Sequence, residues 1–187
     1  SAPCKNADKT IVFGVNESEL KKEDNIVSAA EIRHGFAGEG RYPEIYYEAE
    51  ILEEYKDKTI VDLSAHTLLK NNVGEFYDAD KLFSLVEENV PDDALFVTFK
   101  NVNSLSLEGG FAFESNQLEI ESIFQYANII NSAKSYYCLY SGGNSMAAAV
   151  KYKCNSKVEL NCFLHGTVEE HKNKGFFIFD NVNYIEV

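Results

Sequence analysis

The feature that most constrains the fold is the series of short apolar segments that follows Pro91. Most of these segments are rich in β-branched and aromatic residues, and stretches with Asn, Ser or Gly separate them, as at positions 142–145. Such a pattern is typical of strands joined by tight turns. It therefore predicts an antiparallel sandwich or barrel for the second half of the chain. The predicted strands cover residues 94–100, 104–115, 117–130, 135–141, 145–153, 158–164 and 175–187.

One helix is predicted before Pro91, over residues 78–90. Asp78 is a good N-cap, and the apolar residues Leu82, Leu85 and Val86 recur at helical spacing. The proline then ends the helix. We therefore expect a β-rich domain with one or two helices.

Residues 43–56 fit two structures. As a helix, they begin with proline at the first position and place Ile45, Ala49 and Leu52 on one stripe. As a strand, they pair across a turn at 56–58 with residues 59–69 to form a hairpin. The hairpin is favoured because aromatic and β-branched residues prefer strands.

Length and charge limit the class of protein. A chain of 187 residues, 45% of them hydrophobic, is long enough for one globular domain, which we expect to cover residues 1–187. The formal net charge of −13 argues against a nucleic-acid partner or an anionic membrane surface. No segment approaches the roughly 18 apolar residues that a membrane span requires.

The cysteines indicate an extracellular protein. Their number is even, and no two have the C-x-x-C spacing of a metal site, so we expect two disulfides with the pairing left open. The alternative is four reduced, buried cysteines in a cytosolic protein. The small residues at the start of the chain and a glycosylation acceptor at Asn16 also favour a secreted glycoprotein. The four cysteines are Cys4, Cys138, Cys154 and Cys162.

Motifs for catalysis are not found. The chain has no Gly-x-Ser-x-Gly elbow, no phosphate-binding Gly-x-x-x-x-Gly-Lys sequence and no His-Glu-x-x-His motif. Asp62, Ser64 and His66 alternate along one predicted strand, and we interpret them as its solvated face because a catalytic triad converges from separate elements. The histidines are widely spaced. We therefore expect no enzymatic activity, no cofactor and no metal.

Aromatic residues suggest a different kind of site. The chain has 13 Phe and 11 Tyr, and several tyrosines occur in pairs on predicted strands. They either fill the core or line a β-walled cavity for a small amphipathic molecule. Glutamates on the same segments are candidate counter-charges for a cationic ligand. The candidate lining residues are Tyr47, Phe111, Phe113, Tyr137, Tyr140 and Tyr152, and the glutamates are Glu48, Glu50, Glu119 and Glu121.

Two families share features with the chain. Its size, N-terminal cysteine, cysteine-bearing C-terminal strands and tyrosine-rich hairpins resemble a secreted lipocalin-type (calycin) barrel, although a chain without tryptophan lacks that family's Gly-x-Trp signature. Residues 175–187 resemble the closing strand of jelly-roll carbohydrate-binding modules. The barrel is slightly preferred.

These observations favour a secreted, non-enzymatic binding protein that holds a small amphipathic or cationic ligand in an aromatic pocket, as a lipocalin-like carrier does. One alternative is an interaction or immunomodulatory protein whose acidic surface binds a basic protein partner. A carbohydrate-binding jelly-roll module is the third hypothesis.

Overall fold

The computed structural model describes residues 42–64, 77–99, 116–174 and 176–187. The chain divides into two compact units, one comprising Ser1–Arg41 and Glu169–Ile178 and the other comprising Tyr42–Val168 and Phe179–Val187. In the described part of the first unit, the rings of His171 and Phe176 lie 5.6 Å apart. The fold described below is that of the second unit.

Six parallel strands form one sheet in the order β3-β2-β1-β4-β5-β6. This is the order of a doubly wound, Rossmann-like α/β fold. The strands are β1 (Thr59–Asp62), β2 (Leu95–Phe99), β3 (Gln117–Ile120), β4 (Ser135–Leu139), β5 (Glu159–Leu164) and β6 (Asn183–Glu186).

The predicted antiparallel barrel or sandwich is wrong, and with it both the lipocalin-like barrel and the jelly roll. Hairpins join antiparallel strands, whereas parallel strands need crossover connections, and α4 and α5 lie between strands that were expected to be neighbours in a meander. A parallel sheet is also covered on both faces. All four residues of β1 are accordingly buried, so alternation of polar and apolar residues is not required.

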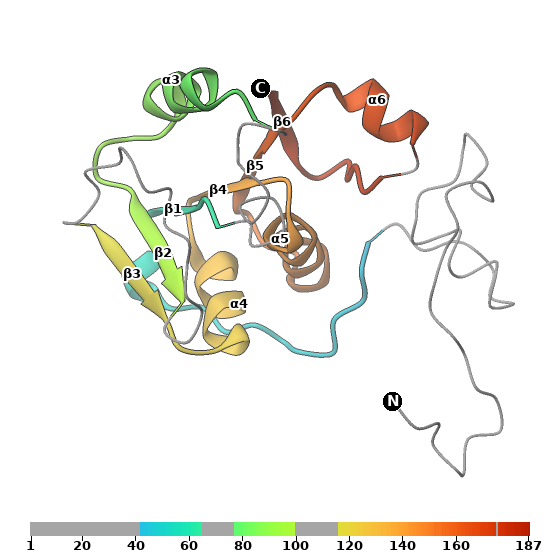
Figure 1. Ribbon diagram of the computed structural model, residues 1–187. Coiled ribbons are helices and arrows are strands. Elements are labelled where there is room, and N and C mark those ends of the chain that lie inside the picture. The colour runs from blue at the N-terminus through green and yellow to red at the C-terminus, as the bar shows by residue number, and fades with distance from the viewer. Residues whose placement is uncertain (1–41, 65–76, 100–115, 175) are drawn as a thin grey trace, which may run out of the picture. The chain divides into compact units, whose positions relative to one another are not determined.

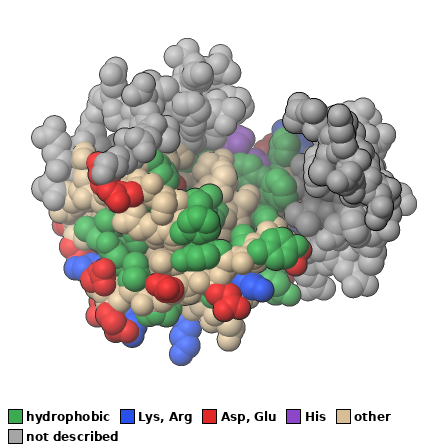
Figure 2. Space-filling view, turned by 90° about the horizontal axis from the view of Figure 1, so that it is seen from below, with side chains coloured by type: hydrophobic (Ala, Val, Ile, Leu, Met, Phe, Trp, Pro, Cys, Tyr) green, Lys and Arg blue, Asp and Glu red, His purple; other side chains and the backbone are tan. Residues whose placement is uncertain are grey.

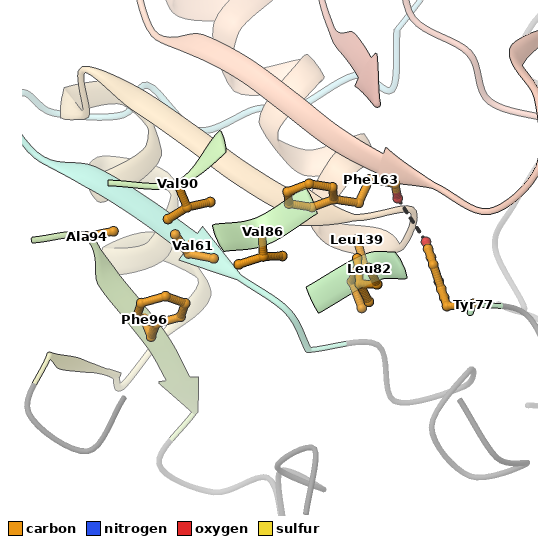
Figure 3. Packing of buried hydrophobic residues seen from close by; sticks show 9 residues of the cluster. All are labelled: Val61, Tyr77, Leu82, Val86, Val90, Ala94, Phe96, Leu139 and Phe163. Carbon is orange, nitrogen blue, oxygen red and sulfur yellow. Dashed lines mark hydrogen bonds between the residues drawn. The ribbon is translucent and has the colours of Figure 1, made fainter. Parts of the chain in front are cut away.

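Helices cover both faces of the sheet (Figure 1). Helix α3 (Ala79–Asn89) lies on one face, while α4 (Ile123–Ser132) and α5 (Gly142–Cys154) lie side by side on the other. On the α3 face, Val61 of β1 and Phe163 of β5 meet Leu82 of the helix in a buried hydrophobic cluster (Figure 3). The Tyr77 hydroxyl donates a hydrogen bond to the carbonyl of Phe163 beside this cluster (2.9 Å).

The predicted helix at residues 78–90 is confirmed. Asp78 is its N-cap, and its carboxylate accepts a hydrogen bond from the Lys81 amide (3.0 Å). Val90 is the C-cap, directly before Pro91. The helix therefore begins and ends where capping chemistry predicts.

One of the predicted strands is a helix, and another is a short strand followed by a helix. Residues 117–130 contain β3 followed by most of α4, and residues 145–153 belong to α5. Serine caps both helices: Ser122 accepts from the Gln125 amide (3.1 Å) and Ser141 from the Gly143 amide (3.2 Å). Of the predicted strand at 175–187, only β6 is a strand, and residues 104–115 lie outside the described part of the chain.

Residues 43–56 form neither the predicted helix nor the hairpin. The segment is extended without strand pairing up to Leu52 and then makes one short 3-10 turn, η2 (Glu53–Tyr55). Hydrogen bonds to α4 hold it, for example from the Leu52 amide to the Ser132 hydroxyl (2.7 Å). The polar groups of its backbone are therefore paired with side chains instead of a neighbouring strand.

The predicted disulfides are not formed. Cys138, Cys154 and Cys162 are free thiols, and Cys4 and Asn16 lie outside the described residues. Cys138 and Cys162 are direct neighbours on β4 and β5. Side chains at paired positions of parallel strands project side by side, so their Cβ atoms are separated by about the strand spacing of ~4.7–4.9 Å. This separation is larger than the ~3.5–4.5 Å between the Cβ atoms of a disulfide.

Within the described residues, no helix has the length and apolar character needed to cross a membrane. Acidic, basic and hydrophobic side chains are interspersed on the face of the molecule that Figure 2 shows. The exposed large hydrophobic residues are Tyr46, Ile51, Ile123, Phe124 and Tyr152.

Candidate functional site

The candidate site lies at the carboxyl edge of the sheet, between β1 and β4. The chain proceeds from β1 to β2 and β3 on one side and then returns to place β4, β5 and β6 on the other. In open α/β sheets, ligands bind outside the carboxyl ends of the strands where the order reverses in this way. The two strands at the reversal end at Asp62 and Leu139.

The turn from β4 into α5 is short and glycine-rich. Only Tyr140 and Ser141 separate the strand from the helix, which begins at Gly142 and Gly143. Gly142 is exposed, and a Cβ added to it would meet nothing within 4 Å. Ser141 already accepts hydrogen bonds from the amides of Gly143 (3.2 Å) and Asn144 (3.1 Å), so it is the partial positive charge of this helix end that suits an anionic group.

The first turn of α5 also holds a buried amide side chain. Asn144 is 1% exposed, and its side chain is a hydrogen-bond partner of the Tyr184 hydroxyl on β6. Burial raises the pKa of that tyrosine to about 12.

A buried carboxylate lies beneath this turn. Asp62 is 2% exposed and accepts hydrogen bonds from the Ser64 amide (2.9 Å), the Ser64 hydroxyl and the Tyr126 hydroxyl of α4. The hydroxyls of Tyr126 and Tyr136 also hydrogen-bond to each other. No cationic side chain of the described residues forms an ion pair with Asp62.

Burial dominates the electrostatics of this cluster. It raises the pKa of Asp62, and the hydrogen bonds from Ser64, Tyr126 and Tyr136 oppose that rise by stabilising the carboxylate. Burial, and then the nearby charge of Asp62, raise the pKa of Tyr126. Tyr126 therefore remains a neutral hydrogen-bond donor at physiological pH.

Gly143 joins the turn to the cluster. A Cβ at this position would lie 2.9 Å from the Tyr136 hydroxyl, 3.0 Å from the Asp62 carboxylate and 3.3 Å from the Tyr126 hydroxyl. The first is closer than real Cβ contacts, so a side chain here would force the helix away. The glycine thus allows the start of α5 to pack directly on the buried polar groups.

The four predicted aromatic residues within the described ranges lie at separate places on the sheet and its helices. Tyr140 lies in the β4–α5 turn, with its amide donating to the Tyr77 hydroxyl (3.1 Å), and Tyr137 packs on the α3 side against Phe163. Tyr47 and Tyr152 are on the opposite side, beside α4 and on α5 respectively. Phe111 and Phe113 lie outside the described residues.

The predicted counter-charges are all exposed. Glu48 and Glu50 lie on the extended segment, Glu119 on the edge strand β3 and Glu121 directly after it. Exposed carboxylates are solvated and need no cationic ligand. These glutamates therefore give no support to the prediction of a cationic ligand.

Sequence reasoning misplaced the carboxylate that the structure makes most unusual. Asp62 was interpreted as part of a solvated strand face, whereas it is buried at the carboxyl end of a central strand. Ser64 hydrogen-bonds to it, and His66 lies outside the described residues. Its position in the sequence could have indicated this burial, because Asp62 directly follows the β-branched run Thr59–Val61 at the end of a strand.

No group of three or more His, Cys, Asp or Glu side chains within the described ranges is placed to hold a metal ion. Comparison of the chain with protein-family models, curated proteins and solved structures finds no match.

Proposed function

We propose that the protein binds a phosphate-bearing small molecule of the nucleotide type at the β4–α5 turn. The observation that carries this proposal is the reversal of strand order, which brings the Ser141–Gly143 turn beside the end of β1. Rossmann-like sheets bind nucleotides in the crevice at this reversal, with phosphate groups against the N-terminus of the helix that follows the first strand, whereas the glycine-rich helix start of this chain follows β4. This proposal keeps a small-molecule ligand, but it replaces the predicted amphipathic or cationic molecule in a barrel interior with an anionic one at the sheet edge.

The chemistry of the turn supports a phosphate group. Gly142 leaves open space where a ligand oxygen can approach the backbone, and the buried amide of Asn144 lies in the same helical turn. Helix α5 spans 13 residues, enough for its aligned peptide dipoles to concentrate positive charge at this end. No lysine or arginine is required for this mode of binding.

The net charge of −13 favours a small anion over a nucleic-acid polymer. A polymer would bring many phosphates near the acidic surface, whereas a mononucleotide places its charge at one point. At physiological ionic strength, surface charges beyond about 8 Å are largely screened. The groups close to the turn therefore decide whether the anion binds.

Amide chemical shifts test the proposal directly. The isotope-labelled protein is titrated with ADP, GDP, CDP, UDP and inorganic pyrophosphate at millimolar concentrations. We expect saturable shifts at the Gly142 and Gly143 amides with at least one nucleoside diphosphate. Absence of saturable shifts with all five compounds, or shifts confined to other parts of the chain, would show that the proposal is wrong.

A matched pair of variants locates the phosphate. Gly142→Glu and Gly142→Gln place side chains of the same size into the same open space, and an acidic residue in the first turn favours the helix. Both variants are therefore expected to fold. Gly142→Glu should weaken nucleotide binding roughly tenfold or more relative to Gly142→Gln, because only the glutamate repels the phosphate. Equal affinities would exclude this turn as the phosphate site.

A further inference from the structure

The buried cluster around Asp62 has the composition of a site that exchanges a proton. The described partners of the carboxylate are all neutral: the amide and hydroxyl of Ser64 and the hydroxyl of Tyr126, which in turn contacts Tyr136. Ionised carboxylates are rarely buried without a cation, because desolvation disfavours the charged form. At neutral pH, the neutral and ionised forms of Asp62 are therefore closer in free energy than those of an exposed aspartate.

Among the described residues, the groups that face Asp62 come from four parts of the chain. Helix α4 contributes Tyr126, β4 contributes Tyr136 and Cys138, the residues after β1 contribute Ser64, and α5 contributes the backbone at Gly143. The first turn of α5, from Gly142 to Ser145, has no titratable side chain. The positive end of α5 is therefore the feature that favours the ionised carboxylate from that side.

We propose that Asp62 takes up a proton from solvent when an anionic ligand binds at the β4–α5 turn, so that ligand affinity depends on pH. This inference rests on the proposed function, since it requires an anion beside Gly142. The Asp62 carboxylate lies 3.0 Å from the position of a Cβ on Gly143, at the same helix end where the phosphate would bind beside Gly142. Two negative charges at one helix end repel each other, and protonation of Asp62 removes the repulsion.

The structure provides a route for the proton. Ser64 is half-buried, and its hydroxyl hydrogen-bonds directly to the carboxylate of the fully buried Asp62. The Ser64 hydroxyl passes its hydrogen to a carboxylate oxygen of Asp62 and takes a proton from a hydronium ion or buffer acid, so the net change is one O–H bond formed on Asp62 and one bond to hydrogen lost by the solvent acid. Burial already raises the pKa of Asp62, which lowers the cost of protonation near neutral pH.

The sign of the effect follows from linkage. The ligand-bound state holds more protons than the free state, so a lower pH favours binding. The dependence is limited to about tenfold in affinity per pH unit, which is the value for one proton. Above the pH range in which Asp62 titrates, its negative charge weakens binding, and a neutral side chain of the same shape is expected to bind the anion more tightly.

Calorimetry of nucleotide binding tests this coupling with Asp62→Asn as the matched variant. The nucleoside diphosphate that gives the largest shifts at Gly142 is titrated between pH 5 and pH 8, in buffers of different ionisation enthalpy, to count protons taken up. We expect the wild-type protein to take up more protons than Asp62→Asn, by up to one. Comparison of the two proteins cancels the titration of the nucleotide itself.

Other outcomes separate the two proposals. If both proteins bind the nucleotide with the same proton uptake and the same pH dependence, the coupling is excluded while the binding site stands. If the wild-type protein shows no shifts at Gly142 and Gly143 with any nucleotide, the proposed function fails first. Should Asp62→Asn not fold, Tyr126→Phe replaces it. Loss of this donor raises the Asp62 pKa further, so the pH profile should move upward, and an unmoved profile excludes the coupling.

Discussion

Two adjacent glycines at the start of α5 have different structural roles. Gly142 faces open space, whereas Gly143 lies against the hydroxyl of Tyr136 and the carboxylate of Asp62. Neither has a positive φ, so backbone conformation does not demand glycine at either position. The requirement at Gly143 is therefore purely steric.

Substitution of each glycine by alanine separates these roles. Gly142→Ala should leave stability unchanged or raise it by up to about 1 kcal/mol, because alanine is the better helix former and meets no atom. Gly143→Ala should lower the free energy of unfolding by about 1–3 kcal/mol, because its methyl group overlaps the buried cluster. Urea unfolding followed by circular dichroism measures both. Equal effects would contradict the close packing at Gly143.

Helix α4 holds the extended segment that precedes β1. Its Asn128 side chain accepts hydrogen bonds from the Tyr47 hydroxyl and the Glu50 amide (both 2.9 Å), and Ser132 accepts from the Leu52 amide (2.7 Å). These side chains replace the neighbouring strand of the predicted hairpin. The polar side chains of α4 therefore hold the extended segment in place. The sequence alone shows that these residues are polar, but not what they bind.

Hydrogen exchange at individual amides tests this arrangement. Asn128→Ala should accelerate exchange at the Glu50 amide roughly 2- to 10-fold, which corresponds to the loss of one hydrogen bond of about 0.5–1.5 kcal/mol, and should affect Leu52 less. Ser132→Ala should give the reverse pattern. If both variants changed the exchange rates of the Glu50 and Leu52 amides equally, these two hydrogen bonds would not act independently.

The sheet as a whole buries its thiols. Cys138 and Cys162 are 1% and 0% exposed on adjacent central strands, whereas Cys154 is half-buried near the end of α5. Burial also raises the pKa of Cys138, which suppresses its reactive thiolate. Since these cysteines are free, disulfides no longer support a secreted location, which stays a prediction.

Thiol labelling of the native protein reports on this burial. Under native conditions Cys154 should react with a maleimide reagent before Cys138 and Cys162, which should react only as fast as the molecule unfolds. Peptide mapping by mass spectrometry identifies the labelled sites and distinguishes them from Cys4. Rapid native labelling of Cys138 would contradict its position in the core.

Local chemistry made several elements predictable. The Asp78 cap, the apolar stripe and Pro91 together define α3, and the β-branched runs at 94–100, 135–141 and 158–164 coincide with β2, β4 and β5. The sequence also contains signals for α5: Ser141 as its N-cap, three consecutive alanines, and Asn155, which adopts the left-handed conformation at its end. It was missed because short apolar runs fit strands and buried helices equally well.

The sequence by itself determined where most elements begin and end, because caps, prolines and branched side chains act on neighbouring residues. The tertiary structure alone decided that the strands are parallel, since pairing joins residues far apart in the chain: β1 lies between β2 and β4, and its register places Asp62 beside Cys138. It also decided the candidate site. Asp62, Tyr126, Tyr136 and Gly143 come from four elements, and only the packing of α4 and α5 on the sheet brings them together.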